Sequence, residues 1–218
     1  IQQICQTQVE PDGLEFDADS VQVQEIREDQ EYQGQRVNLT VYLGNARIGL
    51  QIDVGFGDAI TPRIEEIRYP TILDFPAARI RACPRETVVA EKLQAMVALG
   101  MVNSRMKDFY DLLIMAKEFS FEGSTLVQAI AATFDRRKTS IPLEVPTALT
   151  DEFMMDRDKR TQWQAFLKRN NMEEHCPVDL VQVIKELRKF FVLPLKAAAS
   201  GKEFYLLWPA NGPWTENE

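Results

Sequence analysis

Four segments near the start of the chain alternate apolar and polar residues with a period of two. They read LEFDA, VQVQEIR, VNLTVYL and ARIGLQIDV. This alternation, with its many β-branched residues, is typical of half-buried strands. Because Gly34 and the pair Gly44-Asn45 leave only short connections, we expect antiparallel hairpins. Asp53 falls on the polar side of the last segment, whose apolar side should face the core and consists of Ile48, Leu50, Ile52 and Val54.

Helical patterns follow the strands. Prolines at four positions between residues 59 and 84 exclude long helices there and favour short extended pieces such as AARIRAC. From Glu86 onward, apolar residues recur at helical spacing as far as Gly100, which can cap the helix. The segments TQWQAFLKRN and VDLVQVIKELRKFFVLPL predict two later helices.

A further helix is predicted from about Ser104 to Phe119. Its apolar residues form one stripe, and Asp108 and Asp111 share the opposite side at i, i+3 spacing. Together the patterns predict an α/β (α+β) protein, with a mixed or antiparallel sheet followed by helices. A polar, proline-containing stretch at 136–150 suggests a connection to a helical remainder. We expect a sheet-and-helix domain over 1–120 and a helical C-terminal domain over 121–218.

The composition of the chain excludes some classes of protein and makes others less favourable. The net charge of −8 and the pI near 4.9 oppose binding to nucleic acid unless a local basic patch overrides them. Three separated cysteines and a single histidine, His175, predict neither a disulfide framework nor a zinc site, so a reducing cytoplasm is expected. No apolar run reaches the ~20 residues of a membrane span. The start at Ile1 suggests that the chain lies inside a longer parent protein.

Two groups of polar residues stand out as candidates for chemistry. Asp53 at a strand end beside glycines suits a divalent cation, although a solvated turn aspartate is an equal alternative. Lys92 borders the apolar stripe of its helix, so it could reach a phosphate, or it could be an ordinary surface lysine. Arg105 and Lys107 sit at a helix start, where cations oppose the helix dipole unless they bind an anion.

The alternative explanation for the second group is local pairing. Arg105 with Asp108 and Lys107 with Asp111 have the i, i+3 and i, i+4 spacings that stabilise helices by only a few tenths of a kcal/mol, about 0.3.

The order of these pieces resembles that of a known family. QIDVGFGD, the Tyr69-Pro70 turn, VVAEKLQAM and NSRMKDFYDL follow one another as in the AbiEii-type nucleotidyltransferase toxins. WQAFLKR and the terminal Trp208 and Trp214 extend the resemblance over most of the chain. EKLQAM and RMKDFYDL are the most specific pieces, because their residues and their separation both match.

The resemblance implies a polymerase-β-like nucleotidyltransferase. Such enzymes transfer a nucleoside monophosphate from a nucleoside triphosphate to an acceptor, in characterised members a tRNA end, with Mg²⁺ or Mn²⁺ as cofactor. Positioning and charge neutralisation dominate this chemistry, so a metal-binding carboxylate, a lysine and an arginine are the parts it needs. The resemblance also implies the toxin component of a toxin–antitoxin or abortive-infection system, with a cognate antitoxin.

By this resemblance Asp53 is the metal carboxylate or the general base on the acceptor hydroxyl. Lys92 holds the triphosphate, and Asp108 completes the catalytic set. The remaining candidates for substrate binding are Glu91, Arg105, Lys107 and Asp111.

One motif of the family is missing from these residues. The family opens with a Gly-Ser or Gly-Gly turn and an Asp-x-Asp pair, whereas Asp17-Ala18-Asp19 lacks the glycine turn and falls in the wrong order. We therefore expect these 218 residues alone to bind nucleotide weakly and turn over little.

Two other functional classes of protein remain possible from the sequence. A metal nuclease needs Glu-x-Lys on a strand, whereas Glu91 and Lys92 are adjacent on a predicted helix. A non-catalytic module that binds a protein partner would use the same charged residues only as ion pairs.

Overall fold

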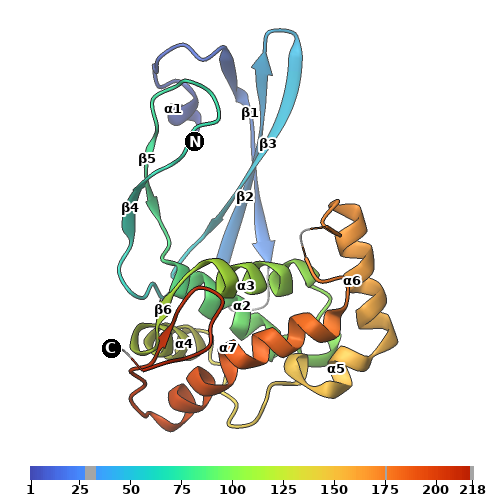
Figure 1. Cartoon of the computed structure of the whole chain (residues 1–218). Helices are drawn as coiled ribbons and strands as arrows, with labels where there is room; N and C mark the ends of the chain where they lie inside the picture. Colours follow the sequence, from blue (N-terminus) through green and yellow to red (C-terminus); the bar gives the residue numbers. More distant parts are fainter. Residues whose placement is uncertain (28–32, 175, 217–218) are drawn as a thin grey trace. The chain divides into compact units, whose positions relative to one another are not determined.

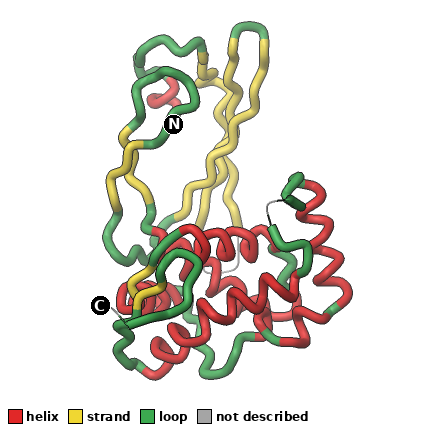
Figure 2. Tube along the Cα trace, viewed as in Figure 1, coloured by secondary structure: helices red, strands yellow, loops and turns green. Residues whose placement is uncertain are grey.

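The long strand-forming segments and most of the helix-forming segments belong to two separate units of the chain. The computed structural model describes residues 1–27, 33–174 and 176–216, and divides the chain into Ile1–Asp58 and Ala59–Glu218. Figure 1 shows the elements of each unit, and Figure 2 shows that strands dominate the first and helices the second. His175 lies outside the described residues.

The first unit is an antiparallel three-stranded sheet with one short helix. Helix α1 (Gln2–Cys5) precedes β1 (Leu14–Arg27), β2 (Gln33–Leu43) and β3 (Ala46–Gly55), and β2 is the central strand. The predicted turn at Gly44-Asn45 joins β2 to β3, with Leu43 opposite Ala46. LEFDA and VQVQEIR form one strand rather than two, because an irregularity between Asp17 and Gln22 absorbs the polar break between them.

The core of this sheet lies on its central strand. Val37, Leu39 and Val41 are buried, and they pair across the sheet with the apolar residues of β3. The predicted core side of β3 is only partly buried, since Ile48 is 41% exposed and Leu50 37% exposed. The alternation is therefore correct but the predicted burial is not, because β3 is an edge strand with a neighbour on one side only.

The second unit combines a β-hairpin with a helical bundle. Its elements are β4 (Glu65–Arg68), β5 (Arg79–Ala82), α2 (Arg85–Leu99), η1 (Gly100–Val102), α3 (Met106–Glu118), β6 (Phe121–Glu122), α4 (Gly123–Arg136), η2 (Thr147–Leu149), α5 (Asp151–Met155), α6 (Arg157–Arg169), α7 (Leu180–Ser200) and β7 (Leu207–Trp208). Strands β4 and β5 pair antiparallel, as do β6 and β7. Antiparallel sheets and helices confirm the predicted α+β class.

The helices of the second unit share one hydrophobic core. Helix α4 packs against α2 and α7, and α3 packs against α7 (Figure 1). Fully buried side chains from several helices, including Leu93, Phe109, Trp163 and Phe190, belong to one cluster. The predicted domain boundary at residue 120 falls inside this unit, where α2, which precedes residue 120, packs on α4, which follows it.

The helix ends follow the expected chemistry. Gly100 adopts a φ of 49° after α2, a conformation that side chains disfavour, and so confirms the predicted stop. Asp179 caps α7 by accepting a hydrogen bond from the Val181 amide. Among the helices of the described ranges, none is long and apolar enough to cross a membrane.

Candidate functional site

The most specific sequence motifs meet where α2 lies against α3. The Nζ atom of Lys92 on α2 lies 2.7 Å from Oδ1 of Asp108 and 2.8 Å from Oδ2 of Asp111, both on α3. Lys107 Nζ lies 2.6 Å from the same oxygen of Asp111, and Arg105 Nε lies 2.8 Å from Oδ2 of Asp108. We call these five residues the α2–α3 ion cluster. It holds three cations and two carboxylates, which leaves one net positive charge.

Asp108 is the buried centre of the cluster. Its side chain is only 5% exposed, which corrects the expectation that it lies on the polar side of the helix. The reason is tertiary, because α2 covers this side of α3 and brings Lys92 within hydrogen-bond distance. Arg105 is close enough for an ion pair, but its N–H does not align for a hydrogen bond, so Oδ2 of Asp108 has no hydrogen-bond donor within the described ranges.

Both local pairs expected from the spacing on α3 are present. Arg105 pairs with Asp108 and Lys107 with Asp111. Lys92 is not an ordinary surface lysine, because its side chain is 20% exposed and contacts two carboxylates. The cluster therefore combines the local pairing with a contact between helices that the pairing alone does not predict.

The cluster keeps Lys92 charged. Burial by itself lowers the pKa of Lys92, but the hydrogen bonds and charges of Asp108 and Asp111 outweigh it and raise this pKa above its ordinary value of 10.5. For Asp111, burial acts to raise the pKa, but Lys107 and Lys92 lower it below the ordinary 3.8. At neutral pH Lys92 is therefore a cation and Asp111 an anion.

Stability should depend on Asp111 in a defined pH range. Because the pKa of Asp111 lies below 3.8 in the folded chain, its charge stabilises the fold above that pH, and this contribution disappears as the pH falls through the folded pKa. Asp111→Asn should lower the free energy of unfolding by roughly 1 kcal/mol at pH 7. Urea denaturation of both proteins should show this difference shrinking below pH 3.8. A difference that stays constant down to about pH 2.5 would contradict the prediction.

The start of α3 is held from outside the helix. The Arg105 amide donates to Oδ1 of Asn103 at 2.8 Å, and the Asn103 carbonyl accepts a hydrogen bond from Lys159 of α6 at 2.9 Å. Arg105 and Lys107 are exposed, with 54% and 72% of their side chains accessible. They therefore place two accessible positive charges at the end of the helix whose dipole also favours an anion.

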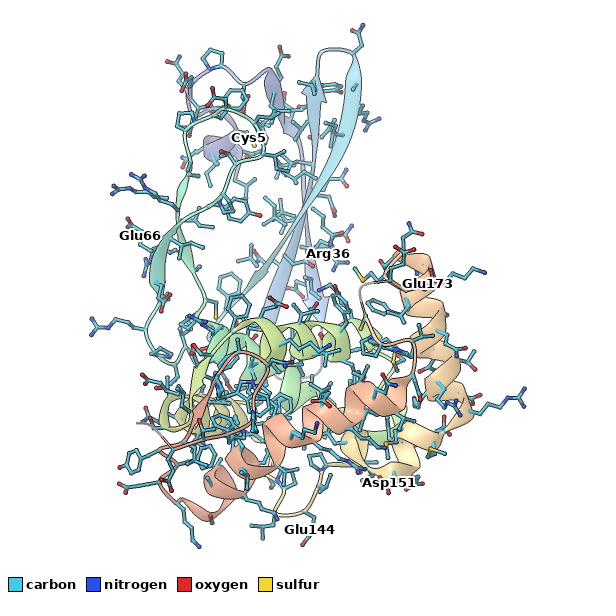
Figure 3. All side chains as sticks on the ribbon, in the orientation of Figure 1. Cys5, Arg36, Glu66, Glu144, Asp151 and Glu173 are labelled. Carbon is cyan, nitrogen blue, oxygen red and sulfur yellow. The ribbon has the colours of Figure 1, made fainter. Side chains whose placement is uncertain are left out.

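Asp53 lies in the other unit, on β3. The guanidinium of Arg36, opposite it on β2 and labelled in Figure 3, donates to both of its carboxylate oxygens, at 2.8 and 2.9 Å. The hydrogen bonds from Arg36 lower the pKa of Asp53 below 3.8. The structure thus confirms the exposed position at a strand end and adds an arginine that the sequence did not predict.

The described residues offer little for a metal ion in their present arrangement. Within the described ranges, no group of three or more histidine, cysteine, aspartate or glutamate side chains could hold one. Asp53 supplies one carboxylate, and Arg36 occupies both of its oxygens. A magnesium ion needs one or two free carboxylates together with water and phosphate oxygens. These side chains therefore do not form a ready metal site.

Glu91, a predicted substrate-binding residue, lies beside the cluster on α2. It is half-buried and precedes Lys92 on α2, and adjacent helix residues face different directions. Its place on a helix also removes the strand geometry that the metal-nuclease alternative requires.

Sequence reasoning missed several residues that the geometry connects to the candidates, among them Arg36 and Lys159. Arg36 faces Asp53, and a signal existed, since opposite charges often pair across neighbouring strands. Lys159 contacts Asn103 from 56 residues away, and no local pattern predicts that contact.

Comparison with known families places the chain in a class of toxins that are nucleotidyl transferases. The matching family description is the AbiEii nucleotidyl transferase toxin of type IV toxin–antitoxin systems, and it matches residues 1–180. The chain belongs to this family. The match includes Asp53, the whole ion cluster and Lys159, and it confirms the resemblance seen in the sequence motifs. No curated protein and no solved structure matches the chain.

Membership in this family supports a role as a toxin that resembles a nucleotidyltransferase. Because the family belongs to toxin–antitoxin systems, it also implies a cognate antitoxin as a partner.

Proposed function

We propose that the chain carries the triphosphate-binding part of a nucleotidyl transferase toxin, which moves a nucleoside monophosphate from a nucleoside triphosphate to an acceptor hydroxyl. The observation that carries the proposal is the α2–α3 ion cluster. Its lysine belongs to one of the two most specific motifs and its aspartates to the other, and three cations outnumber two carboxylates. A net positive cluster with accessible cations suits a polyphosphate.

In the proposed reaction the acceptor oxygen attacks the α-phosphorus of the nucleotide. A new P–O bond forms, the bond to the bridging oxygen breaks, and pyrophosphate leaves with the electron pair of that bond. Arg105 and Lys107 bind the β- and γ-phosphates, because they are exposed at the start of α3. Lys92 neutralises the charge that develops on the leaving group, which requires it to exchange Asp111 for a phosphate oxygen. Lys107 remains beside Asp111 in that exchange and keeps this carboxylate paired.

Asp53 is proposed to receive the proton of the acceptor hydroxyl or to bind a metal ion. Either role requires Arg36 to release it, because a carboxylate with a lowered pKa and both oxygens occupied is a poor base and a poor ligand. Mg²⁺ or Mn²⁺, the cofactor proposed for the family chemistry, would supply charge neutralisation on the phosphates when bound.

The acceptor is proposed to be RNA, with a tRNA end as the first candidate. The net charge of −8 gives RNA no general attraction, so its binding must come from local contacts. Cys5, Cys83 and Cys176, all within the described ranges, form no disulfide, which fits the proposed cytoplasmic location, where thiols stay reduced.

A specific observation also favours the alternative, a non-catalytic module. Both aspartates of the cluster are already paired with cations of the same chain, which is what a purely structural role needs. The two functions differ in one property, because only a transferase releases pyrophosphate from a nucleoside triphosphate.

The test is a transfer assay on the full-length protein with each of the four labelled nucleoside triphosphates and total tRNA. We expect label in the RNA, loss of that label to background when EDTA removes divalent ions, and recovery when Mg²⁺ or Mn²⁺ is added back. Asp53→Asn, which keeps the shape of the side chain, should lower the rate about 100-fold.

Two results would count against the proposal. If no triphosphate labels any RNA although the protein is folded, the interaction module becomes the better assignment. If transfer continues undiminished in EDTA, the proposal of a metal cofactor fails while the transferase assignment stands.

A further inference from the structure

A buried lysine lies behind the α2–α3 ion cluster. Lys159, in the first turn of α6, is 7% exposed, and its Nζ atom donates to the Asn103 carbonyl at 2.9 Å. This carbonyl belongs to a residue that is itself only 1% exposed. The contact joins α6 to the turn that begins α3.

The partners of this ammonium group are unusual for a buried charge. Within the described ranges no carboxylate lies within ion-pair distance of Lys159, and its other close contact is the ring of Phe153, with Nζ 5.4 Å from the ring centre. A buried charge is costly unless it is paired. An apolar side chain of the same length would fill this space at lower cost, so packing alone does not account for the lysine.

Lys159 is also held firmly in place. Its backbone amide donates to Oδ1 of Asp156, the cap of α6. One turn further along, Trp163 is fully buried and its Nε1 atom donates to the Pro177 carbonyl at 3.0 Å. The ammonium therefore acts on Asn103 from a fixed point in the core.

Asn103 connects Lys159 to the cluster, because it contacts both Lys159 and Arg105. Its side chain accepts the hydrogen bond of the Arg105 amide, and Arg105 and Asp108 are the first charged pair of α3. If the Asn103 carbonyl lost its donor, a buried acceptor would be left unsatisfied and the turn would shift to find a new partner. Such a shift would move Arg105 and Asp108 relative to Lys92 on the neighbouring helix.

We propose that Lys159 is a positioning residue of the site: its buried ammonium fixes the Asn103 turn and thereby sets Arg105 and Asp108 for the nucleotide. This inference rests on the proposed function for its catalytic consequence, but its structural part can be tested without substrate.

The first experiment measures amide hydrogen exchange in the chain without substrate, comparing the unchanged protein with Lys159→Met and with Lys168→Met. Lys168 is an exposed lysine on the same helix and serves as the matched control. In Lys159→Met, exchange over residues 104–108 should be faster by about tenfold, while exchange in α7 should not change. The Lys168 variant should match the unchanged protein in both regions.

The second experiment measures transfer by the full-length protein. Lys159→Met should lower kcat/KM for the nucleotide between about tenfold and 100-fold, the range expected when a reacting group is slightly misplaced. Lys159→Arg, which keeps the charge and N–H donors, should recover a large part of that loss. A purely structural role predicts no such recovery when both variants are equally stable.

Each outcome bears on one proposal. Unchanged exchange over 104–108, or equally faster exchange in α7, overturns the positioning role. Full transfer by Lys159→Met also overturns it, provided that Lys92→Ala abolishes transfer. If Lys92→Ala transfers normally, the proposed function fails, and the exchange experiment still decides whether Lys159 holds the turn.

Discussion

Replacing Lys92 by alanine should abolish nucleotide transfer by the full-length protein, with a loss of about a thousandfold, as expected for a cation that stabilises a transferring phosphate. Lys92 is the only member of the α2–α3 ion cluster supplied by α2, and it contacts both carboxylates of α3. Its raised pKa keeps it charged throughout the neutral range. The variant removes this charge from the centre of the cluster and leaves Arg105 and Lys107 in place.

Two further variants show whether the loss of transfer depends on the charge of residue 92 and on its position. Lys92→Arg keeps the positive charge but replaces a compact ammonium by a planar group, so it should recover only part of the activity. Lys168→Ala, on the exposed side of α6, should transfer normally. Circular dichroism melting must show that Lys92→Ala is folded at the assay temperature. Normal transfer by a folded Lys92→Ala protein would remove the nucleotidyl transferase assignment from this site.

The second large effect concerns stability. Lys92→Met should lower the free energy of unfolding by about 3 kcal/mol, because it leaves the carboxylate of Asp108 buried with Arg105 as its remaining cation. Asp108→Leu should also destabilise the chain. The double variant should lose less than the two single losses together, by at least about 1 kcal/mol, since neither charge then lacks its partner. Chemical denaturation of the four proteins measures this coupling.

An exposed pair at the same distance provides the control. Lys189 and Glu186 on α7 are also 2.7 Å apart, but their side chains are 60% and 43% exposed. The corresponding cycle, with Lys189→Met and Glu186→Leu, should give a coupling below about 0.5 kcal/mol. Equal coupling in the two pairs would show that the burial of Asp108 has no energetic role.

The sequence predicted most elements of the fold because their signals are local. Alternation predicted the strands, and single glycines predicted the turn after β2 and the end of α2. Helix α4 was not predicted, although Leu126, Ile130 and Phe134 follow a helical period. Its first residue, Gly123, packs so closely that a Cβ atom there would lie 2.6 Å from the Leu206 carbonyl oxygen. The need for glycine at position 123 comes from Leu206, far along the chain, so no local sequence pattern predicts it.

The candidate site shows the same division between local and distant signals. The two ion pairs within α3 follow from residue spacing alone. The burial of Asp108 and the reach of Lys92 depend on how α2 packs on α3, which spacing does not determine. The functional roles of all the candidate residues remain predictions, as does the cofactor: catalysis for Asp53, Lys92 and Asp108, and substrate binding for Glu91, Arg105, Lys107 and Asp111.

The segment around Trp208 is hydrogen-bonded to the helix that carries the cluster. Nε1 of Trp208 and the backbone amide of Asn211 both donate to the Ala116 carbonyl in the last turn of α3, at 2.7 and 3.1 Å. Thr215 then pairs with Leu207. A substitution at Trp208 that removes this indole donor would therefore disturb the last turn of α3 although it lies 92 residues away along the chain, so the activity of such a variant reports on the helix as well as on the residue replaced.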